Sequence, residues 1–181
     1  MESLGMVELN SIAQGISTAD AILKAANVHI VFSQPVCPGK YAIIISGSVA
    51  DVRAAIDAGN DAGAINVLDT IVIPRIHEDV LSALNGCVDL KDVESLGIIE
   101  TFTLAQALRC ADEAVKSADV ALMEIRLAAG LGGKSFVLLT GSISSVRAAV
   151  RVAVEACENE GMIAGTAVIP APHPELADFI L

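Results

Sequence analysis

The chain repeats itself, and this repeat limits the folds that it can adopt. Three pairs of segments match in the same order: 2–28 with 94–120 at 12 of 27 positions, 39–55 with 133–149 at 8 of 17 positions, and 70–77 with 166–173. A repeat of about 90 residues is longer than a solenoid unit, which has about 20–50 residues. The sequence therefore predicts two tandem copies of one small domain, over residues 1–90 and 93–181, with the boundary near Leu90–Val93.

The same order of elements is expected in each copy. Ser11–Gln14 and Thr103–Gln106 have the S/T-x-x-Q form of a capping box, in which the glutamine side chain reaches back to the amide of the cap residue. Apolar residues at helical spacing follow. In the first copy we predict strands at Leu4–Leu9, Val28–Ser33, Tyr41–Ser46 and Asp69–Pro74, and helices from Ile12 to about Ala26, from Val49 to about Gly63 and over His77–Leu84. The order βαββαβα indicates an α+β fold, in which an antiparallel sheet carries its helices on one face.

Composition excludes several classes of protein. The residues are 54% hydrophobic and the mean hydropathy is +0.64, but no apolar run approaches the roughly 18 residues of a membrane span. Glu2, Glu8 and Asp20 interrupt the region where a signal peptide would lie. We therefore expect a cytoplasmic protein that does not enter membranes and buries its surplus apolar surface in an oligomer. A net charge of −11 and the absence of tryptophan disfavour nucleic acid as a partner.

The cysteines are not arranged in pairs. Cys37, Cys87, Cys110 and Cys157 show no C-x-x-C spacing, and the last three have no cysteine at the matched position of the other copy. In a reducing compartment each is expected to be a free thiol unless it binds something, and buried, inert thiols are the favoured interpretation of the last three. Cys37 differs because Pro35, Pro38 and Gly39 surround it, which indicates a turn.

The matching loop of the second copy, Ala128–Ser135, has the sequence AAGLGGKS, which fits a loose phosphate-binding loop. That chemistry requires a helix directly after the loop. The residues that follow, SFVLLTG, predict a strand. Nucleotide hydrolysis is therefore disfavoured, and a glycine-rich turn is the better interpretation.

Several ordered segments resemble one known family. LGMVE and ADAILKAANV, then a loop with glycine, then ISGSVADVRAA and VIPRIH are similar to the bacterial microcompartment shell domain, and the likeness covers both copies. The resemblance implies a structural protein rather than an enzyme. Tandem-domain members of this kind form homotrimers that mimic a hexagonal tile and pack with other shell proteins around metabolic enzymes.

The resemblance also assigns positions. It places the tile edge at Lys24, Lys116, Arg75, His77 and His173. It places the pore loops at Gln34, Pro35, Val36, Cys37, Pro38, Gly39 and Lys40 and, in the second copy, within 127–134, with Ala129, Gly130, Leu131, Gly132 and Gly133 at its centre. The second copy departs from the family at Ala171, where the edge arginine is expected, and the first copy departs at Ile76, where proline is usual.

For a member with this short Cys-Pro-Gly loop, the resemblance implies a metal site. One Cys37 from each of three chains would bind an iron–sulfur cluster, 4Fe-4S, in the central pore, and an encapsulated or cytosolic redox enzyme would be the electron partner. Two alternatives stay open: a tile whose open or gated pore passes metabolites without a cluster, and a thiol enzyme with Cys37 as nucleophile. The enzyme is disfavoured because the local sequence supplies neither a histidine base nor a helix N-terminus.

Overall fold

The computed structural model describes residues 3–86, 93–128, 130–157 and 161–176. The chain forms two compact units. The first comprises Met1–Ile76 with the short segments Thr103–Ala105 and Ala128–Gly133, and the second comprises His77–Phe102, Gln106–Leu127 and Lys134–Leu181. Residues 87–92, which include Cys87 and most of the predicted boundary, lie outside the described part of the chain.

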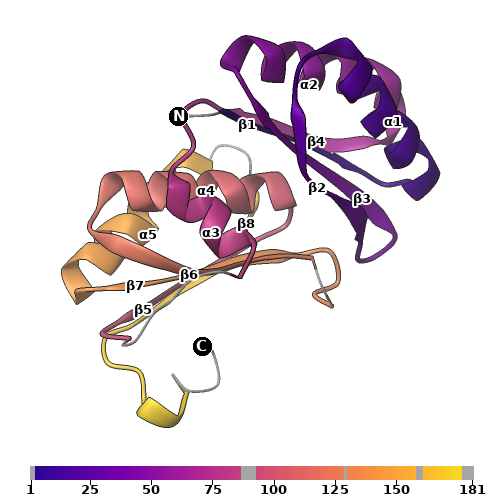
Figure 1. The fold of residues 1–181 in the computed structure, drawn as a ribbon. Helices are drawn as coiled ribbons and strands as arrows, with labels where there is room; N and C mark the ends of the chain where they lie inside the picture. The colour runs from indigo at the N-terminus through magenta and orange to yellow at the C-terminus, as the bar shows by residue number, and fades with distance from the viewer. Residues whose placement is uncertain (1–2, 87–92, 129, 158–160, 177–181) are drawn as a thin grey trace. The chain divides into compact units, whose positions relative to one another are not determined.

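The first unit contains one sheet and two long helices. Its elements are β1 (Ser3–Leu9), α1 (Ile12–Ala25), β2 (His29–Val36), β3 (Lys40–Gly47), α2 (Val49–Gly63), a 3-10 turn at Ala64–Asn66, and β4 (Val67–Ile73). The strands pair antiparallel in the order β2-β3-β1-β4. Figure 1 shows α1 and α2 together on one face of this sheet.

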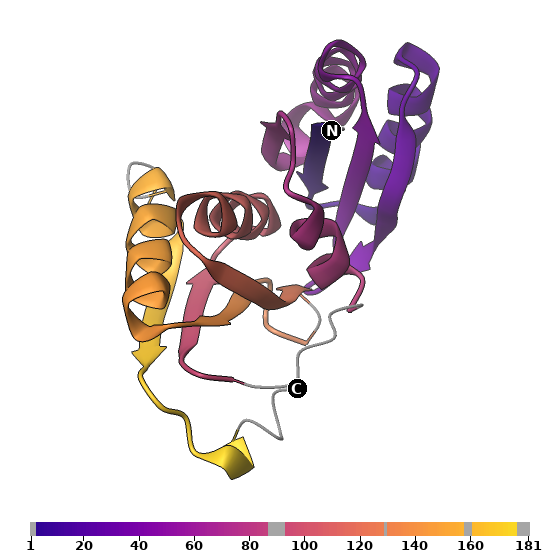
Figure 2. The same cartoon turned by 60° about the vertical axis from the view of Figure 1, so that its left-hand side comes forward.

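The second unit repeats this plan. After α3 (Glu78–Leu84) come β5 (Leu96–Thr101), α4 (Leu104–Ser117), β6 (Val120–Leu127), β7 (Ser135–Gly141), α5 (Ile143–Cys157) and β8 (Ile163–Ile169). The strand order is β6-β7-β5-β8, again antiparallel, and Figure 2 shows α5 lying along β8. The register shift between Ile30 and Phe32 in β2 recurs between Leu122 and Glu124 in β6. The predicted fold class is confirmed, and the order βαββαβ is present in both copies. The last helix expected in the second copy would extend into residues 177–181, which lie outside the described part of the chain.

Two local predictions were wrong. The second strand was expected to end at Ser33, but β2 continues to Val36, because Gln34, Pro35 and Val36 pair with β3. Proline is tolerated there because β2 is an edge strand, where a missing N–H breaks no ladder bond. Ser11 does cap α1 by accepting from Gln14 N, but the Gln14 side chain donates to Ala62 O at 2.7 Å rather than to the cap amide.

In the core of the first unit, α1 and β3 approach each other closely at Gly15 and Tyr41. Gly15 and Tyr41 are both buried, and a Cβ atom placed on Gly15 would lie 2.4 Å from the Tyr41 ring. At the matched positions the second unit has Ala107 and Ser135, both fully buried. Compared with the first unit, the second unit therefore has the larger residue on the helix and the smaller residue on the strand at this contact.

None of the helices in the described part of the chain combines the length and the apolarity that a membrane crossing requires.

We predict that Gly15→Ala lowers the free energy of unfolding by about 1–2 kcal/mol, because overpacking against the rigid ring outweighs the better helix propensity of alanine. Urea unfolding at one fixed chain concentration measures the change. In a Tyr41→Ser background the same substitution should cost nothing or stabilise the protein. Equal losses in both backgrounds would contradict the proposed contact.

Candidate functional site

Cys37 lies in the tight turn that joins β2 to β3. The strands pair up to Val36 and Lys40, Gly39 N donates to Val36 O at 3.1 Å, and the Cys37–Pro38 peptide is cis. Gly39 has φ +85°, a conformation that glycine adopts without strain. Paired strands thus flank the cysteine on both sides, and the turn leaves Cys37 exposed.

The glycine-rich loop of the second copy lies against this turn within the first unit. Cys37 N donates to Ala128 O at 3.2 Å, and a Cβ on Gly133 would lie 2.9 Å from Pro38 Cδ. Ala128, Gly130, Gly132 and Gly133 all have positive φ, and β7 follows the loop directly. The structure therefore brings the two predicted pore loops together in one chain, and it confirms that a strand, not a helix, follows the phosphate-loop-like sequence. Ala129 lies outside the described residues.

A buried ion pair lies at the base of the Cys37 turn. Lys40 Nζ donates to Glu8 Oε1 at 2.6 Å and also approaches Gly133 O at 3.5 Å. The other carboxylate oxygen of Glu8 accepts from Leu104 N, the first amide of α4, at 2.9 Å. Glu8 is fully buried, and this burial raises the pKa of its carboxyl above 4.5, although Lys40 and the Leu104 amide lower it.

The second unit has the matching pair in a different environment. Lys134 Nζ lies 3.2 Å from Glu100 Oε2, and these side chains are 45% and 44% exposed. From the sequence, Lys40 is expected only as a loop residue, and neither Glu8 nor Glu100 is predicted as an ion-pair partner. Both copies have the same glutamate and the same Gly-Lys sequence at matched positions, and this agreement could have indicated the two ion pairs.

The remaining described cysteines form a buried pair in the second unit. The Sγ atoms of Cys110 and Cys157 are 3.2 Å apart, and Cys110 Sγ lies 3.7 Å from Ala153 O. The contact with Cys157 and burial raise the pKa of the Cys110 thiol far above its usual range. A thiol that stays protonated is a poor nucleophile and metal ligand. Their adjacency was missed, although the matched residues, Thr18 and Gly63, also lie together in the first unit.

The predicted edge residues are spread over separate elements. Lys24 pairs with Asp20 on α1, and Lys116 pairs with Asp112 at the same position of α4. Arg75 follows β4 with φ +55°. His77 caps α3 by accepting from Asp79 N through Nδ1 at 3.3 Å, and His173 Nδ1 accepts from Glu175 N at the same distance.

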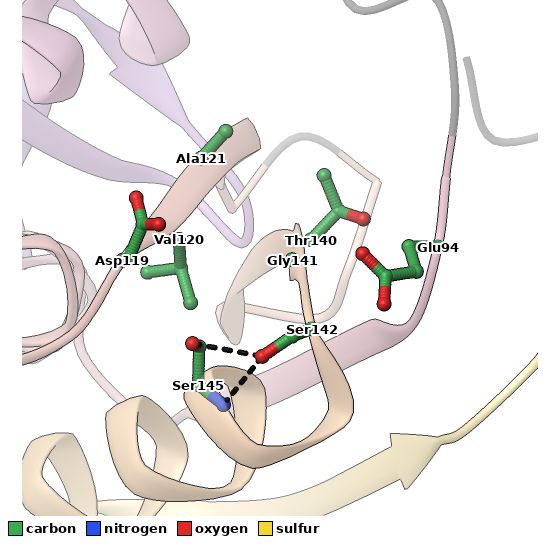
Figure 3. A pocket seen from close by; sticks show the side chains of 8 residues that line it. All are labelled: Glu94, Asp119, Val120, Ala121, Thr140, Gly141, Ser142 and Ser145. Atoms are coloured by element: carbon green, nitrogen blue, oxygen red, sulfur yellow. Dashed lines mark hydrogen bonds between the residues drawn. The ribbon is translucent and has the colours of Figure 1, made fainter.

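A pocket of about 480 Å³ opens in the second unit at the N-terminus of α5 (Figure 3). Ser142 caps this helix and accepts from Ser145 N at 3.2 Å, while Glu94 and Asp119 lie on opposite sides of the pocket. The pocket contains none of the predicted site residues.

The described part of one chain contains no complete site for a metal cluster. Iron–sulfur clusters are usually held by four cysteine thiolates. Over residues 3–86, 93–128, 130–157 and 161–176, no three or more His, Cys, Asp or Glu side chains gather as metal ligands. Cys37 is an exposed thiol of the right chemistry, so these residues fit a cluster only where several copies contribute one thiol each.

Comparisons with known proteins agree on one family. The BMC domain family model matches residues 3–76 and 95–172. The chain is 37% identical to the bacterial microcompartment shell protein PduT of Citrobacter freundii, over 97% of this chain and 95% of that protein. The shell protein PduA of Salmonella typhimurium is 44% identical over 82 residues, which are 44% of this chain and 86% of PduA.

Solved structures give the same result. A microcompartment protein from Desulfitobacterium hafniense is 47% identical and superposes with a TM-score of 0.90, over 98% of this chain and 99% of that chain. A fused, permuted hexameric shell protein superposes with a TM-score of 0.64 at 21% identity, over 86% of this chain and 81% of that chain, which shows a common fold alone.

We predict a pH dependence that arises from Glu8. Its pKa is higher in the folded chain than in the unfolded chain, so the folded state binds more protons between 4.5 and the raised value. The contribution of Glu8 to the free energy of unfolding therefore falls as pH rises through this window. Glu8→Gln should abolish that fall, and the difference between wild type and variant in urea unfolding should change with pH accordingly. Parallel profiles for the two proteins would show that Glu8 does not titrate differently on folding.

Proposed function

The chain belongs to the BMC-domain family of bacterial microcompartment shell proteins, and from this premise we propose that three copies form one pseudo-hexameric tile. Its role in the shell is structural. The observation that supports the trimer is the duplication: each chain contributes two units of one fold, so three chains supply six. Such tiles would pack with other shell proteins through the edge residues Lys24, Lys116, Arg75, His77 and His173.

The lysines have matched geometry that suits an edge. Each lies in the last turn of its helix and pairs with the aspartate one turn earlier. Long lysine stems can lie along a neighbouring backbone while the ammonium group donates to its carbonyl oxygens. The second copy has Ala171 in place of the edge arginine, so the two kinds of edge differ in donors.

The tile is tested by assembly. Light scattering of the wild type should give the mass of three 18.6 kDa chains. Lys24→Gln with Lys116→Gln removes both charges while the amide can still donate to the aspartate one turn earlier, so it should leave this mass unchanged and block the growth of sheets in electron micrographs. Arg151→Gln is the control, because Arg151 is an exposed helical cation paired with Glu155 outside the predicted edge. A monomeric wild type would overturn the tile, and sheets from the lysine variant would overturn the edge.

For the pore we propose an iron–sulfur cluster ligated by Cys37 of three chains. The support is the exposed thiol on a hydrogen-bonded turn, the single cysteine per pair of loops, and the glycine-rich loop whose backbone lies beside it. Three thiolates leave one iron to an outside ligand. When bound, the cluster would allow electrons to cross the shell, with an encapsulated or cytosolic redox enzyme as the partner.

Two alternatives differ in what they require of Cys37. An open or gated metabolite pore needs only the glycine-rich loop and no thiol. A thiol enzyme needs an activated nucleophile, and Cys37 lies in a hairpin turn rather than at a helix N-terminus, where thiolates are stabilised.

Iron content decides between these possibilities. Anaerobically reconstituted wild type should bind about four iron ions per trimer and show a broad visible absorbance band. Cys37→Ala should lose iron and colour and remain trimeric, whereas Cys110→Ala, which removes a buried thiol, should keep both. A colourless wild type would favour the metabolite pore, and iron retained by Cys37→Ala would exclude Cys37 as the ligand.

A further inference from the structure

The edge strands β2 and β6, which lead into the two loops, differ in whether a helix packs on them. Helix α3 packs on β6, and Leu122 of that strand is 1% exposed. Ile30 holds the matching register position in β2, since it pairs with Ile45 as Leu122 pairs with Leu139, yet it is 43% exposed. The β2 strand therefore presents an apolar residue where its counterpart is covered.

The matched helices show the same difference. Leu104 and Leu108 of α4 are fully buried, whereas the corresponding Ile12 and Ile16 of α1 are 40% and 57% exposed. These side chains lie one turn apart on one side of α1. Together with Ile30 and Asp20 they define what we call the α1 surface, formed by Ile12, Ile16, Asp20 and Ile30.

Within the second unit, the cover begins at His77. His77 N donates to Asp112 Oδ1 of α4 at 2.9 Å, and Val80 of α3 is fully buried. Asp112 corresponds to Asp20 of α1. The covering helix thus uses one hydrogen bond to an aspartate and apolar side chains that follow it.

The segment after β8 repeats the start of this covering helix. Leu176 N donates to His173 O at 2.9 Å, as Val80 N donates to His77 O at 3.1 Å, and both histidines accept from the amide two residues on. Leu176, which corresponds to Val80, is 42% exposed. The segment His173–Leu176 therefore has the same local conformation as the start of α3, but its apolar residue Leu176 is exposed rather than packed.

The matched ion pairs Lys40–Glu8 and Lys134–Glu100 also differ in burial. Glu8 is fully buried, and its carboxylate accepts hydrogen bonds from Lys40 Nζ and from Leu104 N, the first amide of α4. Glu100 forms an ion pair with Lys134, and the Glu100 side chain is 44% exposed. The first amides of α1 are the counterpart of the amide that Glu8 accepts, and such amides have no partner inside their own helix.

We propose that a second copy of the chain covers the exposed α1 surface and supplies a second donor to Glu100. The segment His173–Leu176 of one copy covers the α1 surface of the next, with His173 N donating to Asp20, and Glu100 of the first copy accepts from the first amides of α1 in the next. The two surfaces differ, so the contact is head to tail and each copy has one of each. This inference rests on the proposed assembly of several copies and names the residues that join them.

Complementary variants test the pairing. Ile16→Asp disables the α1 surface, and Leu176→Asp disables the covering segment. Each variant alone should fall from three chains to one in native mass spectrometry at micromolar concentration, with its circular dichroism unchanged. Mixed together they should give a complex of one chain of each, because the intact segment of the Ile16→Asp chain meets the intact α1 surface of the Leu176→Asp chain. If Ile16→Asp does not fold, Ile16→Gln makes the same test with a milder change.

Controls separate this inference from the tile itself. Val49→Asp changes an exposed apolar residue in the first turn of α2, outside the α1 surface, and should remain assembled. Glu100→Gln should raise the concentration for half dissociation by about tenfold, as expected for loss of one charge-assisted hydrogen bond, whereas Glu124→Gln, whose carboxylate pairs with Arg126, should not.

A monomeric wild type would refute the trimer. An assembled wild type with assembled Ile16→Asp and Leu176→Asp variants, dissociation of Val49→Asp, or a mixture that stays monomeric would each refute the pairing and leave the tile intact.

Discussion

A buried carboxylate cannot be left without donors, and the arrangement around Cys37 follows from this requirement of Glu8. An unpaired ionised group in a protein interior costs several kcal/mol, so Glu8 must hold its partners in place. Lys40, at the base of the turn, supplies one donor and the first amide of α4 supplies the other. Because Lys40 also approaches Gly133 O, the same ion pair ties the Cys37 turn to the glycine-rich loop. The position of the Cys37 thiol therefore depends on the Lys40–Glu8 ion pair, whose lysine lies three residues after the cysteine.

Much of the fold could be predicted because the sequence contains two copies of the same domain. Each helix start and strand of the first copy has a counterpart, so agreement between copies replaces a comparison with relatives. What failed were features decided by neighbours in space. The continuation of β2 through Pro35 depends on its being an edge strand, and the Gln14 side chain turns to Ala62 because carbonyl groups near the end of α2 need donors.

The site was only half predictable for a related reason. The thiol and the glycines are visible in the sequence because turns need particular residue types. Glu8 and Glu100 have identical local sequences, yet one is buried and the other is 44% exposed. This difference arises from what surrounds each residue, and local sequence does not contain it. The Cys110–Cys157 pair is similar, since two helices that are distant in sequence bring the sulfur atoms together.

Gly15 meets the large Tyr41 ring in the first unit, whereas Ala107 and the small Ser135 hold the matched positions in the second, and this difference has a consequence for folding. Chains with two similar domains are prone to misfold by exchanging matching segments. If α4 took the place of α1 on the first sheet, the Ala107 methyl group would lie where the Tyr41 ring already is. If α1 took the place of α4, a void would remain between Gly15 and Ser135. Each helix therefore fits only its own sheet, and this one contact favours the correct pairing of segments while the chain folds.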